Sequence, residues 1–322
     1  MDLDPTDDQR ALVEMISGFA ADRFDSERSR RFADSFDRAA WSQLAELGTF
    51  GVSLPEADGG VGLATIDDVL VHEALGTALV PGPLVAATLA AGLVDGVLEG
   101  SVIPAVLDST AHGPVIVEHL RDADVLLVVH DEGIDRVDPS SLSADLLARP
   151  TDPLTPVSRL ASVPTGDQIG DAELARTWRR RGSLLASAQL CGNSAGSTAL
   201  AVAYAQEREQ FNRPIGSFQG VKHLLADCWI RTEVARSSVW AAGVTVDEPD
   251  VGDVDRAIAG ARITAARAAT ENGKQSIQVH GGMGFTWEVD AHLFLKRAWV
   301  LETLFGSPDD AADAVAATLA AR

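Results

Sequence analysis

Two polar segments hold the residues of this chain that are best suited to chemistry. Residues 207–219 read Glu-Arg-Glu-Gln-Phe-Asn-Arg-Pro-Ile-Gly-Ser-Phe-Gln and include Arg208, where one predicted helix ends and a Pro/Gly turn leads to the next. Residues 278–286 read Gln-Val-His-Gly-Gly-Met-Gly-Phe-Thr and include Gly281 and Gly282. An arginine can donate two parallel hydrogen bonds to a phosphate, and glycine lets a ligand approach the backbone closely. Together these segments could surround a pyrophosphate.

A second interpretation of both segments is purely structural. Glycines directly after a helix are usually a C-terminal cap, and Ser217 is placed to cap the helix that follows the first segment. Either segment alone therefore fits a helix junction as well as it fits a phosphate site. Both interpretations stay open at this level.

The residue patterns that other common chemistries require are absent from the sequence. No cysteine pair has the spacing of zinc ligands, and the seven histidines form neither His-x-x-x-His nor His-Glu-x-x-His, so we predict no metal site. A Gly-x-Ser-x-Gly elbow, a Walker loop and a Gly-x-Gly-x-x-Gly after a strand are also absent. With 26 basic against 47 acidic residues the net charge is -21, which would repel a nucleic acid backbone. We predict no nucleic acid partner.

The length and texture of the chain predict three regions in the order α, β, α. At about 150 residues per domain, 322 residues suit two domains or three small ones. Residues 1–98 read as helices joined by short loops, and residues 99–170 contain short β-branched runs between Gly, Asp and Pro clusters. Residues 171–322 return to alanine-rich helices. We therefore predict a mainly α fold with a small β domain, divided at these boundaries.

Local patterns predict how the helices begin, end and pack. Apolar residues at helical spacing follow Asp37 and end at Gly48, and Thr65 is placed to cap the next helix. The helix expected over 183–208 carries several small residues within 192–197. We predict that a neighbouring helix approaches it closely there.

We predict a cytoplasmic protein that does not enter a membrane. Cys191 and Cys228 fall inside helical runs, which suits buried thiols in a reducing compartment better than a disulfide. The acidic start, Met1 to Asp8, has neither the basic nor the apolar region of a secretory signal. The uncharged run 74–94 is interrupted by prolines, so it predicts two helices meeting at a turn rather than a membrane span.

The two polar segments resemble the flavin-binding signatures of the acyl-CoA dehydrogenase family. The agreement extends to the loop Leu-Pro-Glu-x-x-Gly-Gly-x-Gly at residues 54–62 and to the helix Ala-His-Leu-Phe-Leu-Lys-Arg-Ala at residues 291–298, so it covers both helical regions. The resemblance implies an N-terminal helical domain, a middle β domain and a C-terminal four-helix bundle that assemble into tetramers. The residue patterns predict the same order.

The resemblance also implies an activity and a cofactor. Family members remove a proton from the α-carbon of an acyl-CoA thioester with a glutamate, while the β-hydride passes to FAD. The adenosine diphosphate part of FAD is bound partly by the bundle of the neighbouring subunit. The positions that match that set here are Arg208, Phe211, Gln219, Gln278, Gly281 and Gly282.

Two departures from the family pattern concern the catalytic base. The common Tyr-Glu-Gly-Thr is replaced by Leu-Phe-Gly-Ser at residues 304–307, so Phe305 takes the place of the glutamate. The alternative position, counted back from Arg208, is Gly182. Glu302 lies close to Phe305 along the chain, but on a helix its side chain is expected to point to another part of the surface. We therefore predict no catalytic residue in this chain.

A third departure lies in the middle region, which is shorter than in the family. The family segment Tyr-x-x-Thr-Glu-Pro-x-Ala-Gly-Ser-Asp, which lines the flavin ring, is missing, and the Gly100-Ser101 pair has none of its neighbours. The parts offered to a neighbour's flavin are kept, whereas the parts that would hold the chain's own flavin are not. This pattern resembles the short, base-less subunits of α2β2 acyl-CoA dehydrogenases of actinobacterial steroid and side-chain catabolism, in which a longer partner subunit supplies the glutamate.

Three interpretations follow. The first is a subunit that completes the FAD site of a partner in a heteromer and performs no proton abstraction itself. The second is a self-sufficient homo-oligomeric dehydrogenase with an unrecognised base, and the third is a scaffold or CoA-ester-binding homologue without flavin. The six retained positions favour the first over the third, because drift would be expected to erode some of them.

Overall fold

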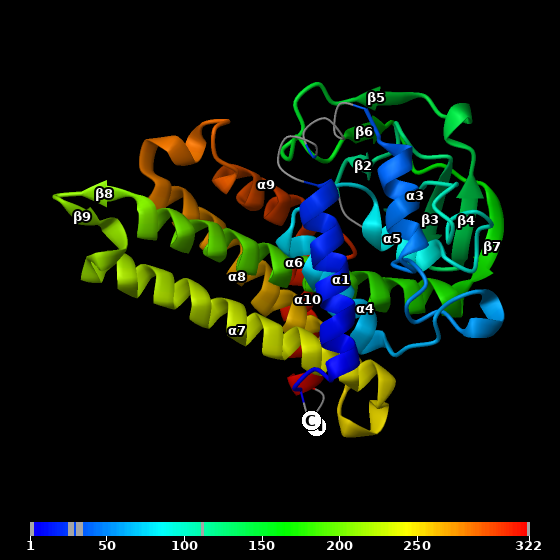
Figure 1. The fold of residues 1–322 in the computed structure, drawn as a ribbon. Helices are drawn as coiled ribbons and strands as arrows, with labels where there is room; N and C mark the ends of the chain where they lie inside the picture. The colour runs from blue at the N-terminus through cyan, green and yellow to red at the C-terminus, as the bar shows by residue number, and fades with distance from the viewer. Residues whose placement is uncertain (1–2, 25–28, 30–34, 111–112, 321–322) are drawn as a thin grey trace.

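The computed structural model describes residues 3–24, 29, 35–110 and 113–320, and it has the α, β, α order that the sequence predicts. Figure 1 shows short N-terminal helices beside a region of strands, from which long helices extend to one side. The predicted fold class, mainly α with a small β domain, is confirmed. Met1 and Asp2, at the start of the segment considered for a secretory signal, lie outside the described residues.

The N-terminal region consists of α1 (Asp7–Arg23), α3 (Arg38–Glu46), α4 (Thr65–Thr77) and α5 (Leu84–Ala90), with the short 3₁₀ helix η1 (Glu56–Asp58) between α3 and α4. The Asp37 carboxylate caps α3 by accepting from the N–H groups of Ala39 and Ala40, and Gly48 follows the helix with a φ of +78°. The uncharged run 74–94 contains the end of α4 and all of α5, so the prediction of two helices meeting at a turn is confirmed.

Thr65 is the first residue of α4 and not its cap, so that prediction is wrong. The cap position is Ala64, and the N–H groups of Thr65 and Ile66 donate to the carboxylate of Asp247 at 3.0 and 3.2 Å. Asp247 lies 182 residues from Thr65 along the chain, so only the tertiary structure can supply this cap.

The strands form two small sheets. The larger has the order β1-β3-β4-β7, built from β1 (Pro104–Asp108), β3 (Val125–His130), β4 (Gly133–Val137) and β7 (Asp167–Asp171), and only its β1–β3 pair is parallel. The smaller has the antiparallel order β2-β6-β5, built from β2 (Val115–Glu118), β6 (Val157–Leu160) and β5 (Ala144–Leu146), and the 3₁₀ helix η2 (Pro139–Ser141) precedes β5. Alternate residues of β3 enter two different apolar cores, which explains its unbroken Val-Leu-Leu-Val-Val run.

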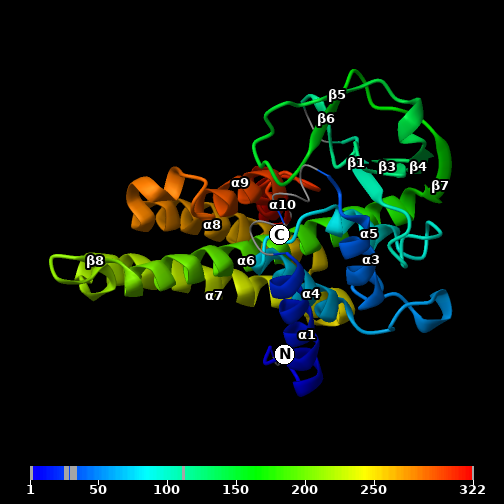
Figure 2. The same cartoon turned by 45° about the horizontal axis from the view of Figure 1, so that its top comes forward.

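The C-terminal region contains α6 (Ala172–Glu207), the hairpin strands β8 (Glu209–Gln210) and β9 (Arg213–Pro214), η3 (Ile215–Ser217), α7 (Gln219–Asp247), η4 (Pro249–Val251), α8 (Val254–His280), η5 (Gly281–Phe285), α9 (Ala291–Leu301) and α10 (Pro308–Ala320). Figures 1 and 2 both show α6, α7 and α8 running alongside one another away from the strands. The β8–β9 hairpin and the turn between α8 and α9 lie at the same far end.

The small residues of α6 are in close contact with α4, as predicted. A Cβ atom on Gly192 would overlap the backbone oxygen of Glu73, and one on Gly196 would overlap that of Thr77. From the other side, a Cβ on Gly76 of α4 would overlap the backbone of Gln189. Glycine is therefore required on both helices for this crossing.

Helix α6 connects all three regions through three consecutive arginines. Arg179 donates to Asp108 of β1 at 3.2 Å, Arg180 donates to Asp255 of α8 at 2.6 Å, and Arg181 donates to Asp68 of α4 at 3.0 Å. Successive residues of a helix point about 100° apart, so three neighbours can reach three different elements. The largest apolar core likewise combines side chains of the N-terminal helices, β3, β4 and α6. The division at 98 and 170 stays a prediction.

The cysteines, possible metal ligands and helix lengths can be compared with the predictions over residues 3–24, 29, 35–110 and 113–320. Both cysteines, Cys191 and Cys228, are buried as free thiols. Within those ranges no three His, Cys, Asp or Glu side chains are grouped as metal ligands, and no helix has both the length and the apolar character needed to cross a bilayer.

Candidate functional site

The predicted cofactor-binding residues lie together at the far end of the bundle. They come from the end of α6, the β8–β9 hairpin, the start of α7, the end of α8 and η5, and all six are exposed: Arg208, Phe211, Gln219, Gln278, Gly281 and Gly282. Figures 1 and 2 show these elements at one tip of the molecule, away from the strands. The structure thus brings together two segments that are about seventy residues apart in the chain.

The β8–β9 hairpin presents Arg208 and Phe211. Arg208 ends α6, and its backbone N–H and C=O are bonded to Tyr204 and Ile215 at 2.8 and 2.7 Å. Within the described residues its guanidinium takes part in no hydrogen bond or ion pair, unlike those of residues 179–181. Phe211 is 87% exposed and has a left-handed φ of +55°, which holds its ring outward. An unpaired cation therefore precedes the hairpin, and an exposed ring lies in its turn.

The glycine turn after α8 is both a helix cap and an open surface. Gly281 is the C-cap residue with a φ of +61°, so the structural interpretation of this segment is correct for the backbone. A Cβ atom added at Gly281 or at Gly282 would meet nothing within 4 Å. The space in front of this backbone is free, as a close-approaching ligand would require.

Two details of this end were not found from the sequence. The Tyr204 ring stacks on the His280 ring with centroids 4.3 Å apart, which joins α6 to α8 directly before the glycines. The only sign of this contact in the sequence is that the chain's single tyrosine lies one helical turn before Arg208. Ser217 does not cap α7, contrary to the prediction: the cap position is Phe218, and the Ser217 hydroxyl is buried with no partner in the described structure.

The two positions that the family resemblance predicts for the catalytic base meet in space. Gly182 lies on α6 and Phe305 follows α9, yet a Cβ atom on Gly182 would overlap the Phe305 ring. Phe305 is 7% exposed and belongs to the largest apolar core. The point that both positions reach is therefore filled by a phenyl ring.

The turn that carries Phe305 is held by a buried arginine. Arg262 of α8 is 1% exposed and donates to the carbonyl of Gly306 from Nε at 3.1 Å and also to the carbonyl of Leu304. Burial lowers the pKa of Arg262 to about 10, and the nearby Glu302 carboxylate opposes that shift. Glu302 accepts a hydrogen bond from Thr270 of α8 at 3.2 Å, which directs its carboxylate toward α8.

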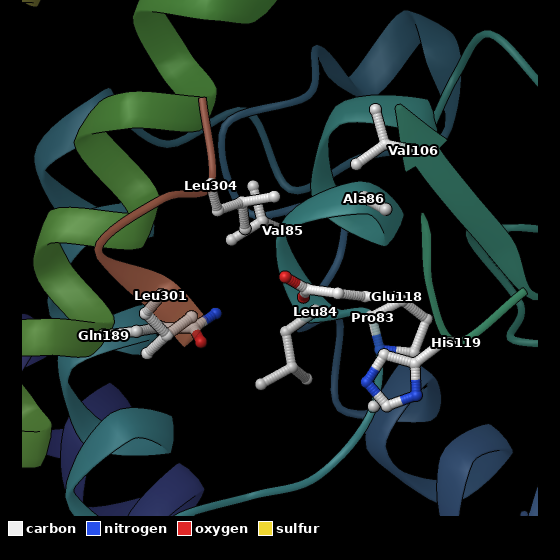
Figure 3. A pocket seen from close by; sticks show the side chains of 11 residues that line it. Pro83, Leu84, Val85, Ala86, Val106, Glu118, His119, Gln189, Leu301 and Leu304 are labelled. Atoms are coloured by element: carbon white, nitrogen blue, oxygen red, sulfur yellow. The ribbon is translucent and has the colours of Figure 1, made fainter. Parts of the chain in front are cut away.

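A cavity of about 30 Å³ lies beside this turn, where all three regions meet. Its walls are mostly apolar and come from the loop before α5, from α5, β1, β2, α6 and α9: Gly82, Pro83, Leu84, Val85, Ala86, Val106, Glu118, His119, Gln189, Leu301 and Leu304. Figure 3 shows the Glu118 side chain extending from β2 into the space beside Leu84 and Val85. The volume suits a water molecule and is far too small for an acyl chain.

Glu118 is the chemically unusual residue of this cavity. Its carboxyl has no hydrogen bond or ion pair among the described residues, and burial raises its pKa to about 7, with Arg297 opposing and Asp152 adding to the shift. Arg297 and Asp152 are buried and paired with each other at 2.5 Å. Burial also lowers the pKa of the adjacent His119 to about 3. No sequence pattern marked Glu118, because its setting depends on elements from all three regions.

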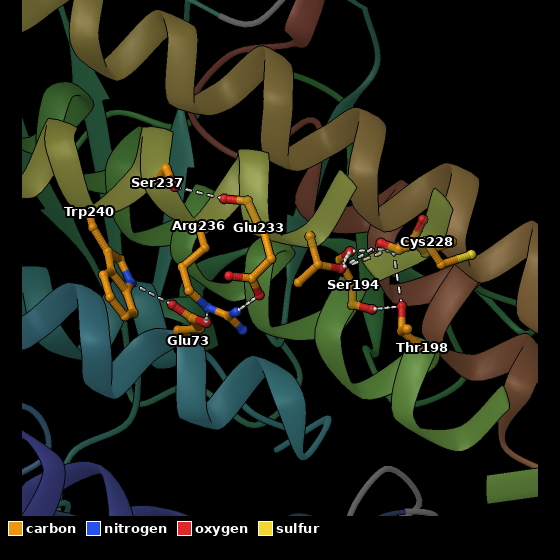
Figure 4. A network of polar contacts seen from close by, with 10 residues as sticks. Glu73, Ser194, Thr198, Cys228, Glu233, Arg236, Ser237 and Trp240 are labelled. Atoms are coloured by element: carbon orange, nitrogen blue, oxygen red, sulfur yellow. Dashed lines mark hydrogen bonds and ion pairs between the residues drawn. The ribbon is translucent and has the colours of Figure 1, made fainter. Parts of the chain in front are cut away.

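The polar groups of two clusters in the bundle bond to one another, as Figure 4 shows. Glu73 of α4 accepts from Arg236 Nε and Trp240 Nε1 of α7, both at 2.7 Å. Asn272 of α8 is buried and donates to Ser194 Oγ of α6 at 2.8 Å. These bonds hold neighbouring helices in register and leave the clusters without a group directed at a ligand.

The fold and its exposed bundle end define a class: proteins with a helical N-terminal region, a small β region and a long C-terminal bundle. Residues 6–98 match the acyl-CoA dehydrogenase N-terminal domain, and residues 179–320 match the acyl-CoA dehydrogenase C-terminal domain. The chain belongs to the acyl-CoA dehydrogenase family, whose members are FAD-dependent oxidoreductases acting on CH–CH bonds.

Three relatives illustrate the match. The chain is 31% identical to acyl-CoA dehydrogenase IpdE2 of Mycolicibacterium smegmatis, over 94% of this chain and 96% of that protein. It is 35% identical to acyl-CoA dehydrogenase FadE34 of Mycobacterium tuberculosis over 91% of this chain but only 45% of that longer protein. The crystal structure of the ChsE4-ChsE5 complex from Mycobacterium tuberculosis superposes with a TM-score of 0.84 at 25% identity, covering 99% of both chains.

Proposed function

We propose that this chain is a subunit of a heteromeric FAD-dependent acyl-CoA dehydrogenase that completes the FAD site of a longer partner, which carries the catalytic glutamate. The observation that carries the proposal is the contact between Gly182 and Phe305. Both positions from which the family supplies a base meet at one point, and hydrocarbon fills it. A phenyl ring accepts no proton, so neither of these two positions supplies the base, and in this proposal the base comes from the partner.

The exposed bundle end fits the adenosine diphosphate part of FAD. Arg208 would donate hydrogen bonds to the pyrophosphate, Phe211 offers a ring for stacking, and the Gly281 and Gly282 backbone offers a surface for close approach. Gln219 and Gln278 add amide donors and acceptors at the same end. When bound, FAD accepts the hydride in α,β-desaturation of an acyl-CoA. The residues of this chain would bind and orient the cofactor at a distance from the reacting atoms.

The relatives support a partner subunit. ChsE4-ChsE5 is described as a complex, and the alignment with FadE34 covers less than half of that protein, so the remainder of FadE34 has no counterpart in this chain. We propose an α2β2 assembly with acyl-CoA as the substrate and with steroid-derived acyl groups as the first class to assay. The exposed apolar side chains at the bundle end are then covered by the partner.

Flavin content tests this proposal directly. The chain is purified alone and together with a longer acyl-CoA dehydrogenase encoded beside it, and the visible-to-ultraviolet absorbance ratio gives the FAD bound per chain. We expect a colourless single chain and a yellow complex with about one FAD per two chains. A yellow single chain with turnover would overturn the proposal, and a colourless complex would favour the scaffold interpretation.

Arg208→Ala is the matching variant within the complex. Loss of a charged hydrogen bond to the pyrophosphate is expected to weaken FAD binding by about 1.5–3 kcal/mol. Arg176→Ala, which removes an exposed arginine from the other end of the same helix, is the control and should bind FAD as the wild type does. Equal flavin affinity in both variants would count against the proposed half-site.

One observation favours the alternative of a self-sufficient enzyme. Glu118 is a half-buried, unpaired carboxyl with a pKa of about 7, which suits a proton acceptor at neutral pH, and it lies beside the Phe305 turn. Glu302, the carboxylate nearest in sequence, is bonded to Thr270 instead. Turnover by the chain alone that is lost in Glu118→Gln and retained in Glu302→Gln would establish this alternative.

A further inference from the structure

The Tyr204–His280 ring pair is a side-chain contact between the two halves of the proposed FAD half-site. Tyr204 lies on the last turn of α6, and His280 is the last residue of α8. Their ring centroids are 4.3 Å apart with the planes inclined by 28°. The Tyr204 hydroxyl also donates to the sulfur of Met283, in the glycine turn, at 3.9 Å. The chain contains no other tyrosine.

The His280 side of this pair is rigid. The imidazole is 4% exposed, and its Nδ1 lies 2.7 Å from the carbonyl oxygen of Ser276. A carbonyl can only accept, so Nδ1 carries the proton and the ring orientation is fixed. Gly281 follows His280 directly and turns the backbone with a φ of +61°. The ring that Tyr204 contacts is therefore one peptide bond away from the open glycine surface.

Tyr204 is also bonded through its backbone to Arg208, the arginine of the proposed half-site. The Arg208 N–H donates to the Tyr204 carbonyl at 2.8 Å, and the Arg208 carbonyl accepts from Ile215 across the hairpin at 2.7 Å. Tyr204 thus contacts the end of α8 through its ring, the glycine turn through its hydroxyl and Arg208 through its backbone carbonyl. Helices α6 and α8 are separate elements, so some contact must set the spacing between their ends.

We propose that Tyr204 is a positioning residue of the half-site: its ring, stacked on His280, sets the spacing between the Arg208 guanidinium and the Gly281–Gly282 backbone. This inference rests on the proposed FAD half-site. A pyrophosphate must be reached by donors from both helices at once, and donors that are already in place need not be ordered when the ligand binds. Tyr204 itself is not expected to touch the cofactor.

Two variants of Tyr204 in the complex with the longer partner separate its ring from its hydroxyl. Tyr204→Leu removes the stack and is expected to raise the Kd for FAD about tenfold, as loss of a coupled contact commonly does. Tyr204→Phe keeps the stack and loses only the bond to sulfur, so we expect it to remain within about twofold of the wild type. FAD affinity is measured by titration of the deflavinated complex, and thermal unfolding of the same samples reports stability. Equal Kd values for wild type and Tyr204→Leu would overturn the inference.

A double-mutant cycle distinguishes positioning from general damage. If Tyr204 acts through Arg208, then Tyr204→Leu should weaken FAD binding much less in the Arg208→Ala background than in the wild type. Strictly additive effects would overturn the inference while leaving the half-site intact. If Arg208→Ala itself leaves FAD binding unchanged, the proposed half-site fails instead.

His280→Leu provides a second route if Tyr204→Leu does not assemble. It breaks the same stack from α8 and leaves α6 unchanged, so the same tenfold weakening is expected. His280→Phe restores an aromatic ring and should recover most of the affinity. Wild-type affinity in His280→Leu, or no difference between His280→Leu and His280→Phe, would contradict a positioning role for the stack.

Discussion

The exposed end of the bundle and the junction of the three regions are built from opposite kinds of contact. At the bundle end, the Arg208 guanidinium has no partner in the described structure, Phe211 is 87% exposed, and the glycine turn faces open space. At the junction, Phe305 is buried on Gly182, and a buried ion pair joins α9 to the loop before β6. The bundle end is therefore exposed and has groups without partners, whereas the junction is filled and buried.

This difference separates residues that stabilise the fold from residues that we propose to bind FAD. A buried phenyl ring contributes to folding through its apolar contacts, whether or not a ligand is bound. The Phe211 ring meets the Phe218 ring edge-on and the Arg208 guanidinium has no partner among the described residues, so we expect both to contribute less to folding than Phe305 does. Substitutions at the junction should therefore change stability without changing flavin affinity, and substitutions at the bundle end should do the reverse.

Phe305→Ala is expected to cause the largest loss of stability. Removing a buried phenyl ring leaves a cavity in the largest core, and we expect the free energy of unfolding to fall by about 3–5 kcal/mol. Urea unfolding of the purified protein measures this loss. Flavin content of the complex should not change under conditions where the variant stays folded. A loss of stability below about 1 kcal/mol would show that the Phe305 site is open rather than filled.

The Glu118→Gln variant should change how stability depends on pH. The pKa of Glu118 is about 7 in the folded chain against 4.5 ordinarily, so between these values the folded state holds a proton that the unfolded chain has released. Stability contributed by this group is therefore lost as pH rises from about 4.5 to 7, by up to about 3 kcal/mol in total. Glutamine cannot ionise. The free energy of unfolding of the variant, relative to that of the wild type, should therefore increase from about pH 4.5 to 7 and stay constant above pH 7.

The difference between variant and wild type is the quantity to follow, because other groups titrate nearby. Burial lowers the pKa of His119 and of His72 to about 3, which makes the folded state less stable as pH falls below 6.5. That effect runs opposite to the one from Glu118 and is common to both proteins. Unfolding at pH 5 and pH 8.5 in matched ionic strength is sufficient. Parallel pH profiles would show that Glu118 is ionised and solvated in the folded chain.

The sequence alone predicts most of the fold and names six residues that the structure brings together at the bundle end. Hydrophobic periodicity locates the helices, and the β-branched runs near 115 and 125 become β2 and β3. The small residues of α6 predict a close helix neighbour, because only glycine allows backbone contact at Gly192 and Gly196. These features depend on local residue order, which a sequence displays directly.

What the sequence does not predict depends on contacts between distant elements. Asp247 caps α4 in place of Thr65, Tyr204 stacks on His280, and Glu118 acquires its raised pKa from burial between three regions. None of these pairs follows from spacing within one element. The match to the family positions identified Gly182 and Phe305 separately, but their direct contact required the tertiary structure.

Gly182→Ala is expected to have a smaller effect on stability, destabilising the wild type but stabilising the Phe305→Ala variant. In the wild type, Gly182→Ala forces a methyl group into the Phe305 ring and should destabilise the protein by about 1–2 kcal/mol. In the Phe305→Ala background the obstruction is gone, and alanine's higher helix propensity should stabilise α6 by up to about 1 kcal/mol. Chemical unfolding of the four proteins closes the cycle. Equal effects of Gly182→Ala in both backgrounds would show that the two positions do not touch.

The smallest change in stability, and the clearest change in binding, is expected for Gly282→Ala. Its methyl group would point into open space and its φ is not left-handed, so the free energy of unfolding should change by less than about 0.5 kcal/mol. In the complex, the same methyl group would stand where the pyrophosphate approaches and should raise the Kd for FAD about three- to tenfold, the equivalent of one lost hydrogen bond. Gly260→Ala, also in open space but near the start of α8 and so far from the glycine turn, is the control and should leave FAD affinity unchanged. If Gly282→Ala binds FAD as tightly as Gly260→Ala does, the turn is a helix cap and nothing more. If only Gly282→Ala weakens binding, a glycine that the fold does not need is kept for a ligand.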